Sequence, residues 1–128
     1  MADVKTLINC DTKEFFRTFN SMRNDLDNFF KKTKLNEIIY KTVDLPDDLS
    51  EDEKEKETIK RYNERFENVV AACFGDNIDL TYNILTKIAF GNEDYINRMG
   101  RIEIVNFVFA VFTNSKLLPF FTSYFSTE

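Results

Sequence analysis

Residues 12–32 read TKEFFRTFNSMRNDLDNFFKK, and this stretch has the clearest periodicity in the chain. Large apolar side chains recur at intervals of four, three, four and three residues, with mostly polar side chains between them; they are Phe15, Phe19, Met22, Leu26 and Phe29. That spacing places them on one face of an α-helix. Asp11 followed three positions later by Glu14 is typical of a capping box, so we predict a helix from about Thr12 to Lys32.

The composition favours more helices of this kind. The chain has 128 residues, a size typical of one domain that can bury a proper hydrophobic core. It has 14 Phe and 5 Tyr but only 3 Gly and 2 Pro, whereas a β-sandwich or barrel needs many turn-forming residues. We therefore predict an all-α fold: a single compact domain over residues 1–128, with about five or six helices around an aromatic-rich core.

Further helices are expected over about 34–41 and 77–90, with a short helical turn within 92–99. The run RIEIVNFVFAVF at 101–112 is ambiguous, because its β-branched and aromatic residues suit a buried helix or a buried strand equally. A lone strand would leave its backbone groups without partners, and no second convincing strand is present. We interpret residues 102–112 as a buried helix.

An acidic segment lies near the middle of the chain. Residues 44–57 contain eight acidic side chains against Lys54 and Lys56, out of a net charge of −5 for the whole chain. Pro46 and its Asp neighbours break the helical pattern, so we predict an exposed acidic loop over residues 43–50. The segment lacks the residue order of a calcium-binding loop, and no metal site is expected there.

The helix after this loop has two different halves. Ser50 with Glu53 forms a second capping box, and Gly75 is placed to end the helix. The first turns are almost wholly charged and should project into solvent. The later part becomes amphipathic at Ile59, and its apolar side chains are Ile59, Tyr62, Phe66, Val69, Val70 and Cys73.

The last residues, NSKLLPFFTSYFSTE at 114–128, are unusually apolar for the end of a sequence. We predict a hydrophobic terminal helix over 116–126. A short helix has only one buried face, so some of its large side chains should pack inward while the others cover a second subunit or a client protein. The partner-binding candidates are Leu117, Leu118, Phe120, Phe121, Tyr124 and Phe125, with Phe120, Phe121 and Phe125 as anchors.

Little catalytic chemistry is available to this chain. It has no histidine, the commonest general base near neutral pH, and no Gly-rich loop that would hold a phosphate. Cys10 and Cys73 lie too far apart in the sequence for a zinc motif. We therefore predict no enzymatic activity, no catalytic residues, no cofactor, no metal and no small-molecule substrate.

The same features bear on partners and location. No basic face stands out that would neutralise nucleic-acid phosphates. The first residues, MADVKTLINC, do not read as a signal peptide, and the longest apolar run, Phe107–Phe112, is too short to span a bilayer. We expect a cytoplasmic protein with reduced thiols that binds neither nucleic acid nor membrane. What remains is an interaction protein that binds a protein client, with a homo-oligomer possible.

Two blocks of sequence carry a resemblance to a known family. The first is a Leu-x-Asn-Cys-Asp-Thr-x-Glu-Phe block, matched at Leu7, Asn9, Cys10, Asp11, Thr12, Glu14 and Phe15. The second is the late Phe-Phe-Thr-Ser block at Phe120–Ser123. With the long early helix and the Pro46-containing acidic segment between them, they make the chain resemble tail assembly chaperones of long-tailed phages and prophages of Gram-positive bacteria.

The resemblance implies a function. Such proteins coat the long, largely helical tape-measure protein while the tail tube polymerises in the host bacterial cytoplasm, and they have no catalytic residues. Relatives often have a tryptophan late in the first helix, where this chain has Phe29 and Phe30. The alternative is a small helical interaction or regulatory protein of phage or bacterial origin that acts through homo-oligomerisation.

Overall fold

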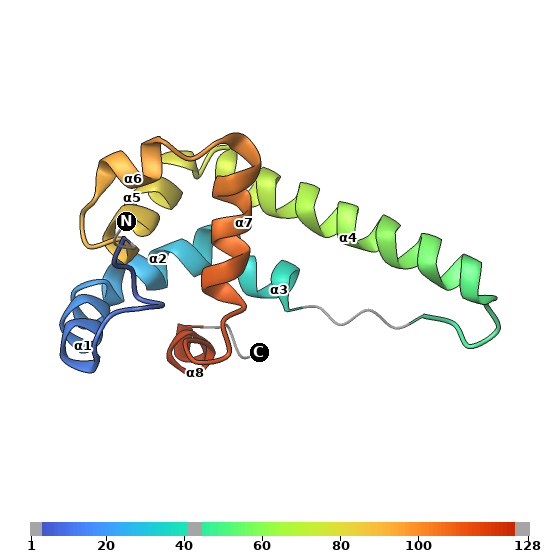
Figure 1. Ribbon diagram of the computed structural model, residues 1–128, viewed down its shortest axis with the longest axis horizontal. Helices are drawn as coiled ribbons and strands as arrows, with labels where there is room; N and C mark the ends of the chain where they lie inside the picture. Colours follow the sequence, from blue (N-terminus) through green and yellow to red (C-terminus); the bar gives the residue numbers. More distant parts are fainter. Residues whose placement is uncertain (1–3, 41–44, 125–128) are drawn as a thin grey trace.

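The computed structural model describes residues 4–40 and 45–124, and this part of the chain is helical and contains no strand (Figure 1). The helices are α1 (Thr12–Ser21), α2 (Arg23–Thr33), α3 (Leu35–Ile39), α4 (Glu51–Phe74), α5 (Ile78–Ile88), α6 (Glu93–Asn97), α7 (Arg101–Phe112) and α8 (Leu118–Phe121), followed by a 3₁₀ turn, η1 (Thr122–Tyr124). The predicted all-α class is confirmed, but the described residues form eight helices where about five or six were predicted, because the first long helix is divided and several helices are short. The ambiguous run at 102–112 is helical, and it lies within α7.

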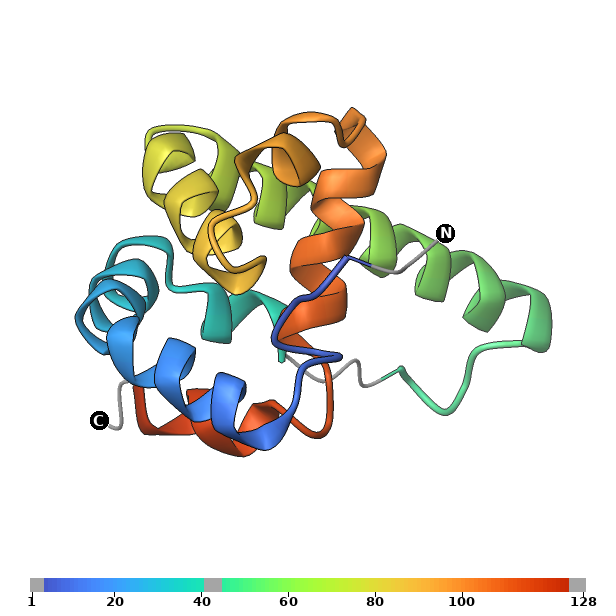
Figure 2. The ribbon, with the colours of Figure 1, turned by 60° about the vertical axis from the view of Figure 1, so that its left-hand side comes forward.

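The helix predicted from Thr12 to Lys32 is in fact two helices, which meet at Met22. The Met22 N–H donates to the carbonyl of Phe19, three residues earlier, at 3.0 Å, whereas an α-helical hydrogen bond spans four residues. The Ser21 hydroxyl also donates to the carbonyl of Thr18 at 2.7 Å. The resulting bend turns α1 and α2 in different directions (Figure 2). On α1, the Phe15 and Phe19 rings contact Phe120, whereas on α2 the Phe29 ring stacks on Phe112.

The core is rich in aromatic rings, as predicted. The Phe29 and Phe112 rings stack with centroids 5.5 Å apart, and the Phe112 and Phe121 centroids are 4.9 Å apart. Such ring pairs contribute about 0.5–1.5 kcal/mol beyond the area that they bury. The largest fully buried side chains are Phe29, Phe112, Phe121, Met22, Leu26, Leu35, Ile84, Leu85, Ile88, Ile96, Val69 and Val108.

The helix α4 extends well beyond the rest of the molecule (Figure 1). It starts with the predicted capping box: Ser50 Oγ accepts from the Glu53 N–H, and the Glu53 carboxylate accepts from the Ser50 N–H, both at 3.2 Å. The amphipathic pattern predicted from Ile59 onward does not coincide with burial along its whole length. Ile59 and Tyr62 are each 55% exposed, and full burial begins only at Val69. Among the residues that the structure describes, no other helix lies beside the outer half of α4 (Figure 1).

The acidic loop is exposed over most of its described length. In residues 45–50, Leu45 and Leu49 are half-buried, and the other four side chains are exposed. Residues 43 and 44 of the predicted loop lie outside the described residues.

The terminal helix is shorter than the predicted 116–126. After Leu118–Phe121 the chain continues as a 3₁₀ turn to Tyr124, and residues 125 and 126 lie outside the described part. The Thr122 hydroxyl donates to the carbonyl of Pro119 at 3.0 Å. This bond reaches back three residues and favours the tighter turn over a longer α-helix.

Candidate functional site

The predicted partner-binding residues divide into a buried and a half-buried group. Leu117 and Phe121 are buried, and the Phe121 ring centroid lies 4.9 Å from that of Phe112 and 6.1 Å from that of Phe30. Leu118, Phe120 and Tyr124 are half-buried, and Phe125 lies outside the described residues. As placed, Phe121 belongs to the core, and a partner would reach it only if α8 left the core.

The half-buried group forms a surface together with one residue that the sequence analysis missed. Phe16 on α1 is 45% exposed, and its ring centroid lies 6.0 Å from that of Phe120. The Phe19 ring lies beneath, 5.4 Å from Phe120 and 6.3 Å from Tyr124. We call Phe16, Phe120 and Tyr124 the terminal aromatic surface. The doublet of Phe15 and Phe16 was the available signal, because adjacent positions lie about 100° apart on a helix and Phe16 is therefore on the flank of the apolar seam.

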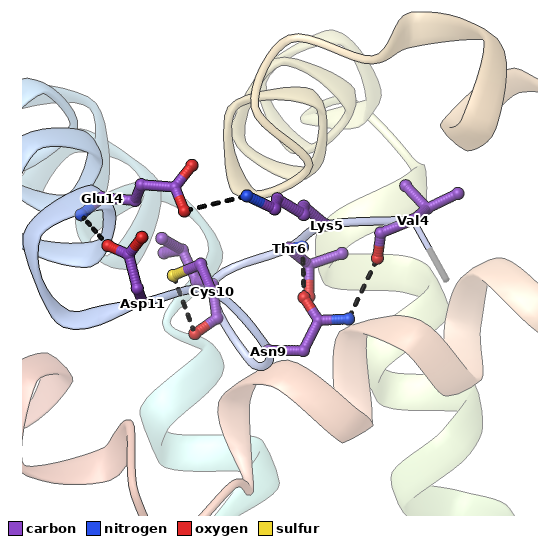
Figure 3. Close-up of polar contacts among 8 residues, drawn as sticks. Val4, Lys5, Thr6, Asn9, Cys10, Asp11 and Glu14 are labelled. Atoms are coloured by element: carbon purple, nitrogen blue, oxygen red, sulfur yellow. Dashed lines mark hydrogen bonds and ion pairs between the residues drawn. The ribbon is translucent and has the colours of Figure 1, made fainter. Parts of the chain in front are cut away.

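The segment before α1 is fixed by its own side chains (Figure 3). The Asn9 side-chain oxygen accepts from the Thr6 N–H at 2.7 Å, and its amide nitrogen donates to the carbonyl of Val4 at 3.0 Å. The Leu7 N–H donates to the carbonyl of Ile88 at 3.0 Å, which ties the segment to the end of α5. Leu7 and Asn9, two residues of the first resemblance block, therefore shape the approach to α1.

Asp11 and Glu14 of the same block start the helix (Figure 3). The Asp11 carboxylate accepts from the Glu14 N–H at 2.8 Å, and this backbone hydrogen bond lowers the pKa of Asp11. The Lys5 ammonium donates to the Glu14 carboxylate at 3.1 Å, which raises the pKa of Lys5. Burial raises the pKa of the half-buried Cys10 thiol. The block thus orients α1 so that Phe15 contacts Phe120, with ring centroids 4.8 Å apart.

A second apolar surface lies between α4 and α7. It contains a groove of about 360 Å³, which is lined by Phe66, Val70, Phe74, Tyr82, Met99, Arg101, Ile102, Ile104 and Val105. Ile102 is 60% exposed. The exposed side chains of Ile59 and Tyr62 continue the α4 side of this groove outward, at helical spacings of three and four residues. We call Ile59, Tyr62, Phe66 and Val70 the α4 face.

The groups with shifted pKa values or unusual partners have structural roles. Burial raises the pKa of the Cys73 thiol to about 12 and also raises that of Tyr40, whose hydroxyl donates to the carbonyl of Phe112. The Glu103 carboxylate accepts from the Gly100 N–H at 3.4 Å, so it caps the start of α7. Among residues 4–40 and 45–124, no three acidic or Cys side chains are grouped to hold a metal ion. No helix in this part is long and apolar enough to cross a membrane.

Comparison with protein-family models, with curated proteins and with solved structures finds no match for this chain. Function is therefore inferred from the contacts described above and from the resemblance of the two sequence blocks.

Proposed function

We propose that this protein is a non-enzymatic tail assembly chaperone, which binds the tape-measure protein in the host bacterial cytoplasm during tail morphogenesis. One observation carries the proposal. The two blocks that carry the resemblance lie at opposite ends of the sequence, yet they meet in the fold: the Phe15 and Phe120 ring centroids are 4.8 Å apart. The first block starts the helix that carries Phe16, and the second block supplies Phe120, so both blocks contribute to the terminal aromatic surface.

The terminal aromatic surface has the chemistry for a helical client. A largely helical protein offers apolar stripes at intervals of three and four residues, and an aromatic surface buries such stripes. Phe16 and Phe120 rest on Phe15 and Phe19, which are buried in the core. The surface is therefore supported from below, and a client can cover it without any unfolding of the chaperone.

Co-purification with the tape-measure protein tests this proposal. The wild-type chain should recover the client, and Phe16→Ser should reduce the recovery without unfolding the protein, because Phe16 is 45% exposed. Ile78→Ser is the matched control, since Ile78 is similarly exposed but lies on α5. The proposal is wrong if the wild type recovers no tape-measure protein, or if Phe16→Ser recovers as much as Ile78→Ser.

The location of the gene gives an independent test. A tail assembly chaperone gene is expected between the gene for the major tail protein and a very long tape-measure gene. A regulatory or host-interaction protein, which is the alternative function, would be encoded elsewhere. That alternative is favoured by the α4 face, which is separate from the terminal aromatic surface and suits self-association.

A further inference from the structure

The α4 face is only partly covered by the described residues: Phe66 stacks on the Phe109 ring of α7 with centroids 6.4 Å apart, whereas Ile59 and Tyr62 are mostly exposed. Its four residues follow one another at spacings of three, four and four positions, so they lie within an arc of about 80° on the helix surface. Ile59 and Tyr62 are each 55% exposed. Towards the start of α4, the same arc continues with Glu55 and Asp52. From the groove towards the start of α4, the side chains on this arc are therefore first two exposed apolar groups, Tyr62 and Ile59, and then two carboxylates, Glu55 and Asp52.

The groove has the complementary chemistry. Of the nine side chains that line it, eight are apolar and one, Arg101, is a cation. Ile102 is 60% exposed at this groove. The groove is therefore suited to an amphipathic helix whose apolar side chains are followed by an acidic group. The outer half of α4 is such a helix, and within one chain it extends away from α7 (Figure 1).

We propose that the outer half of α4 from a second copy of this chain occupies the groove, and that the exchange is reciprocal. In an antiparallel pair centred near Glu64, Ile59 of one copy meets Val70 of the other, and Tyr62 meets Phe66. Glu55 and Asp52 then pass along the groove that Arg101 lines. A two-fold axis satisfies both copies at once, because the same surface supplies the inserted helix and the groove that receives it.

Charge selects the antiparallel arrangement. Residues 47–57 contain seven acidic side chains against Lys54 and Lys56, and they form the outer end of α4 with the loop before it. Parallel helices would bring two of these acidic ends together, which is unfavourable. An antiparallel pair places them at opposite ends of the interface.

The dimer is tested by measuring the molecular mass of the protein in solution as a function of its concentration. Wild type should form a dimer by sedimentation equilibrium, and Ile59→Ser with Tyr62→Ser should weaken it about tenfold or more, since loss of one buried apolar side chain suffices for a factor of that size. Phe16→Ser is the matched control, because it removes an exposed apolar residue from the terminal aromatic surface and should leave the dimer unchanged. The circular dichroism spectrum should stay helical in all of these variants.

Charge exchange and crosslinking test the geometry. Arg101→Glu should weaken the dimer, and Glu55→Lys in the same chain should restore part of the loss. Asp52→Cys in a Cys10→Ser background should give little disulfide-linked dimer, because the antiparallel arrangement separates the two copies of position 52. A monomeric wild type, a dimer that Ile59→Ser and Tyr62→Ser leave intact, or efficient crosslinking at position 52 would each overturn the proposal. Loss of client recovery instead of dimer in the α4 variants would identify the occupant as a client helix.

Discussion

The terminal segment and the outer half of α4 both combine large apolar side chains with polar neighbours. Their surroundings differ. Phe121 is fully buried among the rings of Phe112, Phe30 and Phe19. Ile59 and Tyr62 are mostly in contact with solvent. Apolar spacing thus identifies which residues share a helix face, but the presence of a neighbour for that face depends on the tertiary arrangement.

The largest expected effect on stability is in the buried terminal segment. Phe121→Ala should lower the free energy of unfolding by about 3–5 kcal/mol, because it leaves a cavity among three aromatic rings. Urea denaturation followed by circular dichroism measures the change. A loss of less than about 1 kcal/mol would mean that α8 contributes little to the core and that Phe121 is available to a partner.

A matched pair of isoleucines compares the packed and exposed environments directly. Ile84 on α5 is fully buried, whereas Ile59 on α4 is 55% exposed. Ile84→Ala should lower the free energy of unfolding by about 2–5 kcal/mol, and Ile59→Ala should change it by no more than about 0.5 kcal/mol. Both are measured by urea denaturation at a concentration low enough to keep the protein monomeric. Equal losses would show that the outer half of α4 packs against something within the monomer.

A smaller effect is expected from the cap of α1, the helix that packs against the terminal segment. The pKa of Asp11 is lowered in the folded protein because the carboxylate accepts the Glu14 N–H. A lowered folded-state pKa stabilises the fold above the unfolded-state pKa of about 3.9, and this contribution is lost as the pH falls through the folded-state pKa. Asp11→Asn keeps the capping oxygen but does not titrate.

Thermal unfolding from pH 6 downward tests the Asp11 prediction. The midpoint should fall more steeply with decreasing pH in wild type than in Asp11→Asn, with the difference appearing below about pH 5. If the midpoint temperatures of the two proteins change in parallel with pH, the Asp11 cap stabilises the fold equally in its charged and neutral forms.

The smallest effects should come from the acidic side chains of α4. Glu53→Gln, Glu55→Gln and Glu57→Gln should each change the free energy of unfolding by only tenths of a kcal/mol. Glu53→Gln keeps the side-chain oxygen of the capping box, and Glu57 pairs with Arg61 at 3.0 Å within one helix face that is partly exposed. A larger loss, measured by urea denaturation, would indicate that these side chains are packed or paired more extensively.

The sequence predicted local structure well and tertiary neighbours poorly. The all-α class follows from the apolar spacing and from the scarcity of Gly and Pro. The helix starts after Asp11 and Ser50 follow from local hydrogen bonding, and both side-chain caps are present. The bend at Met22 was not predictable from periodicity, because the apolar spacing continues unchanged across it. The exposure of Ile59 was missed because helical spacing does not reveal where the neighbouring helices end.

The predicted partner-binding residues show the same limit. All six candidates at the end of the sequence are large and apolar, and nothing in their spacing separated Phe121, which is buried, from Phe120, which reaches the surface. The difference in burial depends on the aromatic rings of α1 and α7. These rings cover Phe121 completely but cover only part of Phe120. Phe16 was overlooked because it flanks the seam of its helix.

The contact between Phe15 and Phe120 also has a consequence for the order of events during translation. The ribosome makes α1 about a hundred residues before it makes the segment that covers it, which corresponds to roughly 5–20 s at typical elongation rates. During this interval Phe15 and Phe19 have no α8 against them. The newly made α1 is therefore exposed to other unfinished chains on the same polysome, and packing of this part of the core must wait for the last helix.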